Sequence, residues 1–227
     1  MYKLLFYIML FISTVYQAHA ANDMLKRRAF NAPENISTNV HSLTKYLIQP
    51  CDNDYDKLYV IAYWIASHIS YDEYQYRNGK VDKRMNNYQG NILKEKAGVC
   101  GDFAQLFADM ANIANVRHVE VVEGYVLEKQ TILKKTYRRK DMPAVGHAWN
   151  QAEINGRRFY IDTTFMSGNR VSPSSNFTTN LKHKLDLKKN GRQNQVYTNV
   201  TDDYFDFTPK QEIKKKHMLH LQDKFIK

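Results

Sequence analysis

The chain has 227 residues, enough for one domain of ordinary size that buries its own core. It carries 33 Lys and Arg against 23 Asp and Glu, a formal net charge of +10, which favours contact with anionic polymers or lipids. The sequence contains no Gly-rich phosphate loop, zinc-ligand spacing, paired-carboxylate motif or internal repeat, so nucleotide, zinc and glycoside chemistry are excluded as first hypotheses and we expect no cofactor.

The first twenty residues have the pattern of a secretory signal peptide. Lys3 precedes an apolar run over 4–15, and Ala18-His19-Ala20 supplies the small residues that signal peptidase requires. The run is about a dozen residues long, too short for the roughly 20 that a helix needs to cross a bilayer. We therefore expect cleavage near Ala20, no transmembrane anchor, a single mature domain over 21–227, and a periplasmic or secreted location.

Export limits the partners that the basic residues could meet. These residues cluster in three stretches, 134–140, 182–192 and 214–216. An exported protein does not usually meet nucleic acid, and the chain has no recognition motif for it. We expect the clusters to face an anionic cell-envelope surface or, as the simpler alternative, only solvent.

Two helices are predicted in the first third of the mature chain. Apolar residues recur at helical spacing over 36–48, and Pro50 ends that run. After an Asp-rich turn, Asp54 or Asp56 can cap a second helix with a broad apolar face, in which Trp64 is expected to be a core residue. The polar, Tyr-rich stretch over 71–89 predicts a long surface loop at the rim of a cleft.

A cysteine follows that loop, at the start of a third apolar helical pattern. The stripe begins directly after Cys100 and consists of Phe103, Leu106, Phe107, Met110 and Ile113. Unpaired N–H groups and the positive dipole end at a helix N-terminus favour a thiolate. Gly98 and Gly101 allow a sharp turn around the sulfur. A small buried cysteine that begins a core helix is the alternative interpretation.

The mature chain holds one other cysteine, Cys51, in a polar turn. In an oxidising compartment, two cysteines commonly form a disulfide, which would silence a nucleophile. A core of this size does not need such a bridge, so a free Cys100 and a Cys51–Cys100 disulfide both stay open at this point.

The pattern changes from helix to strand after the Cys100 helix. Alternation over 119–126 predicts a strand, in which Gly124 marks a bulge or a close approach. The basic stretch over 127–145 is treated as a hairpin or flap, with a strand around 130–137. Nearer the C-terminus, apolar residues over 197–207 predict a final strand, and the basic tail over 211–226 is expected to be partly helical.

The dipeptide Asn155-Gly156 lies between two alternating runs and predicts a two-residue hairpin turn. The turn fixes the register, which pairs Ile154 with Arg157, Glu153 with Arg158, Trp149 with Asp162 and His147 with Thr164. Asp162 then shares a face with His147 as its diagonal neighbour, with roughly 7–8 Å between the backbones. The opposite face is the predicted core side, formed by Ala148, Ala152, Ile154, Phe159 and Ile161.

A thiol, an imidazole and a carboxylate that meet in this way can perform nucleophilic catalysis. A carboxylate that binds one imidazole nitrogen orients the other nitrogen to take a proton from a thiol. Cys100, His147 and Asp162 occur along the chain in the order of a papain-type triad. Each has a structural alternative, since His147 could be a satisfied core histidine and Asp162 a strand-end cap.

Five blocks resemble the transglutaminase-like superfamily, which has a papain-like fold, and in particular its kyphoscoliosis-peptidase-like branch. The nucleophile block is Gly98-Val-Cys-Gly-Asp-Phe-Ala-Gln-Leu-Phe, the histidine block His147-Ala-Trp-Asn, and the aspartate block Tyr160-Ile-Asp-Thr-Thr-Phe. The stretch over 62–72 resembles the helix before the cysteine, and the stretch from Asp203 to His217 resembles that branch's C-terminal extension. Together the blocks cover most of 43–217.

The resemblance implies a transglutaminase-like domain with its core at about 36–217, an α+β fold in which N-terminal helices pack on an antiparallel β-sheet. It implies Cys100 as nucleophile, His147 as general base and acid, and Asp162 as the residue that orients the histidine. We also name Trp149 as a candidate substrate-binding residue. No oxyanion donor is assigned beyond the Cys100 backbone N–H.

The expected reaction is acyl transfer or hydrolysis at a peptide or carboxamide bond of a protein or peptide substrate. A non-catalytic binding module for cell-envelope or protein ligands is the alternative. The sequence departs from the family at Phe165, where tryptophan is common and where we expect a change of packing only. It also has a long basic insert before His147, which could reshape the cleft.

Overall fold

The computed structural model describes residues 22–72, 88–127, 144–167, 170–171, 200–208 and 217–219, together with Tyr7 and Tyr76. The predicted signal peptide, apart from Tyr7, lies outside these ranges, and so do residues 73–87, apart from Tyr76, of the loop predicted over 71–89 and residues 128–143 of the flap predicted over 127–145. Both ends of the predicted loop are regular structure instead, since 71–72 belong to a strand and 88–89 to a helix. The basic clusters over 134–140, 182–192 and 214–216 also lie outside the described ranges. Among the described residues, no helix is long and apolar enough to cross a membrane.

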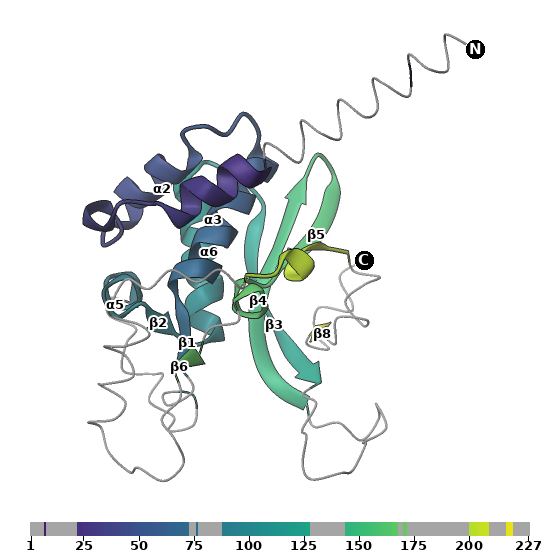
Figure 1. Cartoon of the computed structure of the whole chain (residues 1–227). Helices are drawn as coiled ribbons and strands as arrows, with labels where there is room; N and C mark the ends of the chain where they lie inside the picture. Colours follow the sequence, from purple (N-terminus) through teal and green to yellow (C-terminus); the bar gives the residue numbers. More distant parts are fainter. Residues whose placement is uncertain are drawn as a thin grey trace.

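Helices on one side and an antiparallel sheet on the other form an α+β fold, as predicted (Figure 1). The five-stranded sheet has the order β7-β5-β4-β3-β8. Its strands are β3 (Val119–Leu127), β4 (Ala144–Ile154), β5 (Arg157–Ile161), β7 (Phe205–Phe207) and β8 (His217–Leu219). A small parallel sheet has the order β2-β1-β6, with strands β1 (Ser70–Asp72), β2 (Ala97–Gly98) and β6 (Arg170–Val171).

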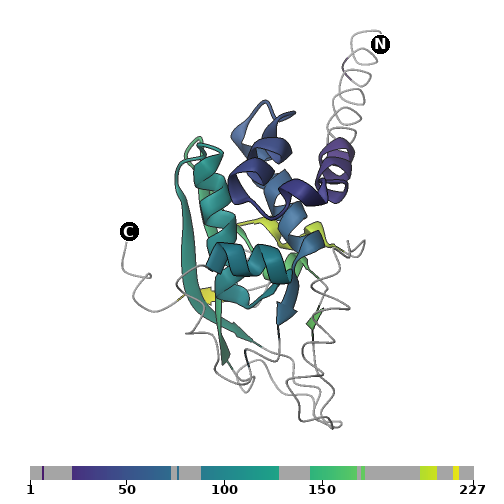
Figure 2. The same cartoon turned by 90° about the vertical axis from the view of Figure 1, so that its left-hand side faces the viewer.

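The helical layer consists of a helix over 22–30 and the elements η1 (Glu34–Ile36), α2 (Val40–Ile48), α3 (Asp54–His68), α5 (Tyr88–Glu95) and α6 (Cys100–Ile113). Two short elements, α7 (Thr163–Met166) and η5 (Asp202–Tyr204), lie next to the sheet. Figure 2 shows α6 between the long strands and the other helices, and α6 contacts α3 on one side and β4 on the other. The helix that begins at Cys100 is therefore held between the sheet and the other helices.

The helix α3 is the centre of the helical layer. Every residue from Leu58 to His68 is buried, so the predicted apolar face extends around the whole helix. The predicted caps Asp54 and Asp56 are wrong, because the helix is capped by Asn53, the residue directly before Asp54. Its Oδ1 accepts a hydrogen bond of 2.9 Å from the Asp56 N–H, and its Nδ2 donates to the Asp56 carboxylate at 2.8 Å. An asparagine can serve both roles, whereas a carboxylate only accepts.

The turn between α5 and α6 sets the direction in which the chain enters the helix at Cys100. Lys96 has a left-handed φ of 52° and is 3 % exposed; its Nζ donates to the Ser37 carbonyl and lies 4.9 Å from the centre of the Trp64 ring. At Gly98 a Cβ would lie 2.8 Å from the Asp102 Cβ, so glycine is needed there. A Cβ at Gly101 would meet open space, so of these two positions only Gly98 must be a glycine for steric reasons.

The Asn155-Gly156 hairpin forms as predicted, with φ of 53° and 74° at its two turn residues. The predicted register holds from Ile154 opposite Arg157 to Asn150 opposite Ile161. The further pairs Trp149–Asp162 and His147–Thr164 are wrong, because β5 ends at Ile161 and Asp162 becomes the N-cap of α7. The predicted core side is confirmed for four residues that are at most 7 % exposed, namely Ala148, Ala152, Phe159 and Ile161.

One other strand prediction needs correction. Gly124 forms no bulge, because it pairs in regular register with His147 on β4 and with Leu219 on β8, and a close approach at this glycine stays a prediction. In the tail, residues 217–219 form β8 against β3, which supplies the backbone groups of Gly124 to Val126 with hydrogen-bonding partners. The rest of the tail that was predicted to be partly helical lies outside the described residues.

The cap of α3 provides a test of the helical layer. Asn53→Ala removes the acceptor for the Asp56 N–H and should lower the free energy of unfolding by about 1 kcal/mol. Asp54→Ala is the matched control, because it keeps the cap and removes a half-exposed ion pair with Lys57 at 2.8 Å and a first-turn carboxylate, each of which contributes a few tenths of a kcal/mol. Urea titrations of both variants would show this order; a larger effect at Asp54 would contradict the assigned cap.

Candidate active site

Cys100 is the first residue of α6 and is partly exposed. The Val99 N–H donates to the Asp102 carboxylate at 2.9 Å, and the Val99 carbonyl accepts from the Phe103 N–H at 3.1 Å. These two bonds fix the first turn of the helix around the sulfur. The thiol thus sits where unpaired helical N–H groups and the helix dipole favour an anion.

His147 and Asp162 form a buried pair. The distance from His147 Nε2 to Asp162 Oδ2 is 2.7 Å, and the two side chains are 6 % and 0 % exposed. The other carboxylate oxygen, Oδ1, accepts from the Phe165 N–H at 3.0 Å, and the Asp162 N–H donates to the Tyr204 carbonyl at 2.9 Å. Backbone groups on both sides of Asp162 therefore hold its carboxylate in position for the imidazole.

Cys100 approaches the same imidazole, and its side chain hydrogen-bonds with His147. Since Asp162 occupies Nε2, Nδ1 is the nitrogen that remains for the sulfur. Burial alone lowers the pKa of His147, but the charge and hydrogen bond of Asp162, helped by those of Cys100, raise that pKa to about 10. The imidazole is therefore a cation at neutral pH, and a cation beside a thiol favours the thiolate.

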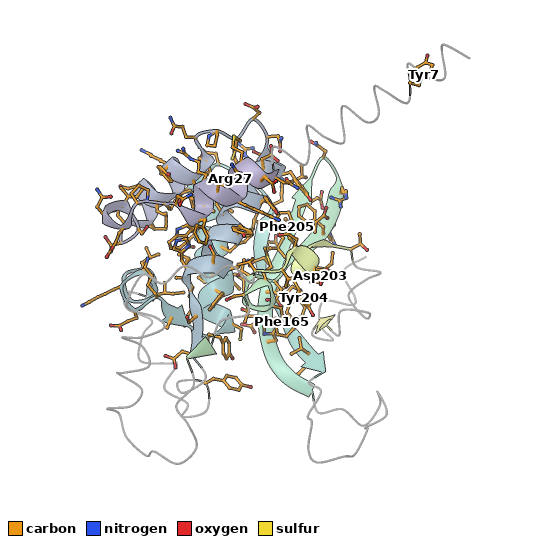
Figure 3. All side chains as sticks on the ribbon, viewed as in Figure 1. Tyr7, Arg27, Phe165, Asp203, Tyr204 and Phe205 are labelled. Carbon is orange, nitrogen blue, oxygen red and sulfur yellow. The ribbon has the colours of Figure 1, made fainter. Side chains whose placement is uncertain are left out.

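Two aromatic rings enclose the imidazole. The Phe165 ring stacks on it with 4.8 Å between centroids and an interplanar angle of 19°, and the Trp149 ring lies at 5.8 Å and 23°. Tyr204 packs edge-on against Phe165, and Figure 3 shows these two side chains side by side next to β4. The faces of aromatic rings attract cations, so both stacked rings favour the protonated imidazole.

These contacts add to the sequence interpretation in two places. Phe165 is more than a packing change, because it touches the imidazole and its N–H binds Asp162. Its position three residues after a helix-capping aspartate is the signal that could have indicated this contact.

Trp149 is 1 % exposed and belongs to a small cluster with Tyr160 and Phe207, on the face of the sheet opposite to the main core. Its contact with substrate stays a prediction.

Both cysteines are free thiols, so the disulfide alternative is not realised in the structure. Cys51 packs against the main hydrophobic core, and burial raises its pKa to about 11. It is thus protonated at neutral pH and distinct in character from a thiol beside an imidazolium. Among the described residues, no group of three or more His, Cys, Asp or Glu could hold a metal ion.

The fold and these three side chains define a class of α+β protein in which a cysteine at the first position of a helix meets a buried histidine–aspartate pair. The family model of the transglutaminase-like superfamily matches residues 41–163, which is more than half of the chain and includes all three side chains. The chain belongs to the transglutaminase-like superfamily.

Individual relatives are more distant. The chain is 27 % identical over 143 residues to the kyphoscoliosis peptidase of Mus musculus, covering 63 % of this chain and 20 % of the mouse protein. The Homo sapiens kyphoscoliosis peptidase is 27 % identical over 136 residues, covering 60 % and 19 %. The chain thus matches about a fifth of the length of these relatives. A solved structure of a TGase is 19 % identical with a TM-score of 0.37, covering 71 % of this chain and 36 % of that one.

The raised pKa of His147 predicts how stability depends on pH. The folded-state pKa of about 10 lies above the ordinary value of 6.5, so protonated His147 stabilises the fold fully below pH 6.5. This contribution is lost as pH rises through 10. His147→Gln should therefore destabilise the protein by about 2 kcal/mol near pH 6 and by less at each higher pH.

The matched control is His68, a second buried histidine among the described residues. Burial lowers the pKa of His68 to about 4, so it is almost wholly neutral above about pH 8 in both the folded and the unfolded protein. The effect of His68→Gln should then be constant between about pH 8 and 10, where that of His147→Gln still falls. Thermal unfolding at several pH values would measure both effects, and a pH-independent effect of His147→Gln would contradict a cationic imidazole.

Proposed function

We propose that this protein is a cysteine enzyme that transfers acyl groups from peptide or carboxamide carbonyls. Cys100 is the nucleophile, His147 the general base and acid, and Asp162 the residue that orients the imidazole. The observation that supports this most is the buried 2.7 Å bond from His147 Nε2 to Asp162, because it leaves Nδ1 for Cys100. Membership of a superfamily that includes cysteine proteases and acyltransferases agrees with it.

The reaction begins from a thiolate–imidazolium pair. The Cys100 sulfur attacks the carbonyl carbon, a C–S bond forms, and the oxygen becomes an anion, for which we assign the Cys100 backbone N–H as hydrogen-bond donor. As this intermediate collapses, the C–N bond breaks and the Nδ1 proton of His147 passes to the departing amine or ammonia. The product is a thioester on Cys100 with a neutral imidazole, which Asp162 holds through Nε2.

The second half of the reaction regenerates the enzyme. Neutral His147 takes a proton from an incoming water or amine, which attacks the thioester and displaces the Cys100 sulfur as a thiolate. Water gives hydrolysis, and an amine gives a new amide bond. The named relatives are peptidases, so peptide hydrolysis is the outcome to assay first. An exported location for this activity is part of the proposal and rests on the first twenty residues.

One assay examines both outcomes with the same probes. The purified protein is incubated with β-casein and dansylcadaverine, and gels are scored for casein cleavage and for fluorescent amine in casein. Cys100→Ala should lower whichever rate the wild type shows by about 1000-fold or more, because it removes the nucleophile. Cys51→Ala is the matched control and should keep the rate within about twofold, because that thiol packs against the core.

Two results would contradict the proposal. Full activity of Cys100→Ala on every substrate that the wild type uses would remove Cys100 as the nucleophile. An unreactive Cys100 in the wild type, labelled by iodoacetamide at pH 6 no faster than a free thiol, would favour the non-catalytic binding module. A fast reaction at pH 6 is expected of a thiolate–imidazolium pair.

A further inference from the structure

Asn150 is a fully buried polar residue on β4 that the catalytic proposal does not use. It lies three residues after His147, and its register partner on β5 is Ile161, the residue directly before Asp162. Its other partner in the sheet is Val121 on β3. Asn150 therefore lies in the sheet near both His147 and Asp162.

The side chain of Asn150 also reaches the helix that carries the cysteine. Its Nδ2 donates to the Ala104 carbonyl at 2.9 Å and lies 3.4 Å from the Glu120 carbonyl. Ala104 is one helical turn beyond Cys100, so a single amide connects the first turns of α6 to β3 and β4. Both neighbours are hydrogen-bond acceptors, which fixes the orientation of the amide with its nitrogen toward them.

The surrounding contacts between α6 and the sheet are apolar. Phe103 and Phe107 on α6 and Ala152 and Phe159 on the sheet are completely buried in the same core cluster. Apolar burial is non-directional, so it holds α6 against the sheet without setting how far the helix slides along it. A directed hydrogen bond to the helix backbone does set that position, as buried polar groups do in other helical interfaces.

The position of α6 matters because the two reactive groups lie on different layers. The Cys100 sulfur lies on the helix and the His147 ring on the sheet, and a misplacement of about 1 Å can lower a reaction rate by about 100-fold. We propose, on the basis of the catalytic function proposed above, that Asn150 is a positioning residue that fixes α6 on the sheet so that Cys100 faces His147.

The carbonyl oxygen of the Asn150 amide indicates that this side chain contributes little to the stability of the fold. Its Oδ1 is buried and has no hydrogen-bond partner among the described residues. An unsatisfied buried oxygen destabilises the fold, and an apolar side chain of the same size in such a place is often neutral or stabilising. Stability and reactivity should therefore respond differently to substitution of Asn150.

The test uses Asn150→Leu, which removes the donor and keeps the number and branching of the side-chain heavy atoms. The rate of Cys100 alkylation by iodoacetamide is followed from pH 5 to 9 by mass spectrometry of the labelled peptide, and thermal unfolding is measured in parallel. Asn150→Leu should alkylate at pH 6 about tenfold or more slowly than the wild type, with its pH profile shifted toward that of a free thiol. Its melting temperature should stay within about 2–4 °C.

Two further variants separate positioning from packing. Ile161→Val perturbs the packing at the register partner of Asn150 and should lower the melting temperature while keeping the pH 6 rate within about twofold. Asn150→Asp has the shape of asparagine, and its neutral carboxyl can donate to Ala104. It should keep near wild-type reactivity at pH 5 to 6 and lose it as the new carboxyl ionises at higher pH.

The outcomes are distinct for each proposal. A pH 6 rate of Asn150→Leu within twofold of the wild type, or a loss no greater than that of Ile161→Val, would overturn the positioning role. If Asn150→Leu does not fold, an Asn150→Asp profile without recovery at low pH would overturn it equally. A wild-type Cys100 that is no faster than a free thiol would instead contradict the catalytic function itself.

Discussion

The hydrogen bond between His147 Nε2 and Asp162 Oδ2 is the contact on which the rest of the candidate site depends. A carboxylate that is completely buried needs partners for both oxygens, and here the imidazole and the Phe165 N–H provide them. The same bond assigns the second imidazole nitrogen to Cys100. Two separate features, the charge on the histidine and the orientation of its ring, therefore follow from one pair of atoms.

The two layers of the fold contribute different parts of this arrangement. The sheet supplies His147 and Asp162 through one hairpin, so a local turn sets their relation. The helical layer supplies Cys100 from the start of α6, after a turn in which Lys96 is held in a left-handed conformation by buried contacts. Such a conformation costs a non-glycine residue about 1–2 kcal/mol, and it persists because the surrounding core over-determines it.

Local chemistry explains why much of this could be predicted from sequence. A two-residue Asn155-Gly156 turn allows one register, and that register by itself brings His147 and Asp162 to the same end of one hairpin. The start of α6 at Cys100 follows equally from its apolar period. The register failed only beyond Ile161, because the Asp162 side chain caps α7 and the strand ends there. Strand alternation carries no information about where such a cap ends the strand.

The contacts that were missed join residues far apart in the chain. Phe165 stacks on His147 across the end of β5, and Asn150 donates to Ala104 across 46 residues. Neither contact has a period or a turn signal, because each depends on how α6 and α7 pack against the sheet. A change of packing was the prediction for Phe165, and Asn150 had no predicted role. Their roles become visible only when the layers are assembled.

The charge state of the His147 imidazole is the most direct test of this account. Nitrogen-15 NMR of the histidine side chains, assigned with His147→Gln, would measure protonation of both ring nitrogens between pH 6 and 10. The account predicts an imidazolium at pH 7 that titrates near pH 10 and becomes neutral at much lower pH in Asp162→Asn. A neutral His147 ring at pH 7 in the wild type, unchanged in Asp162→Asn, would contradict it.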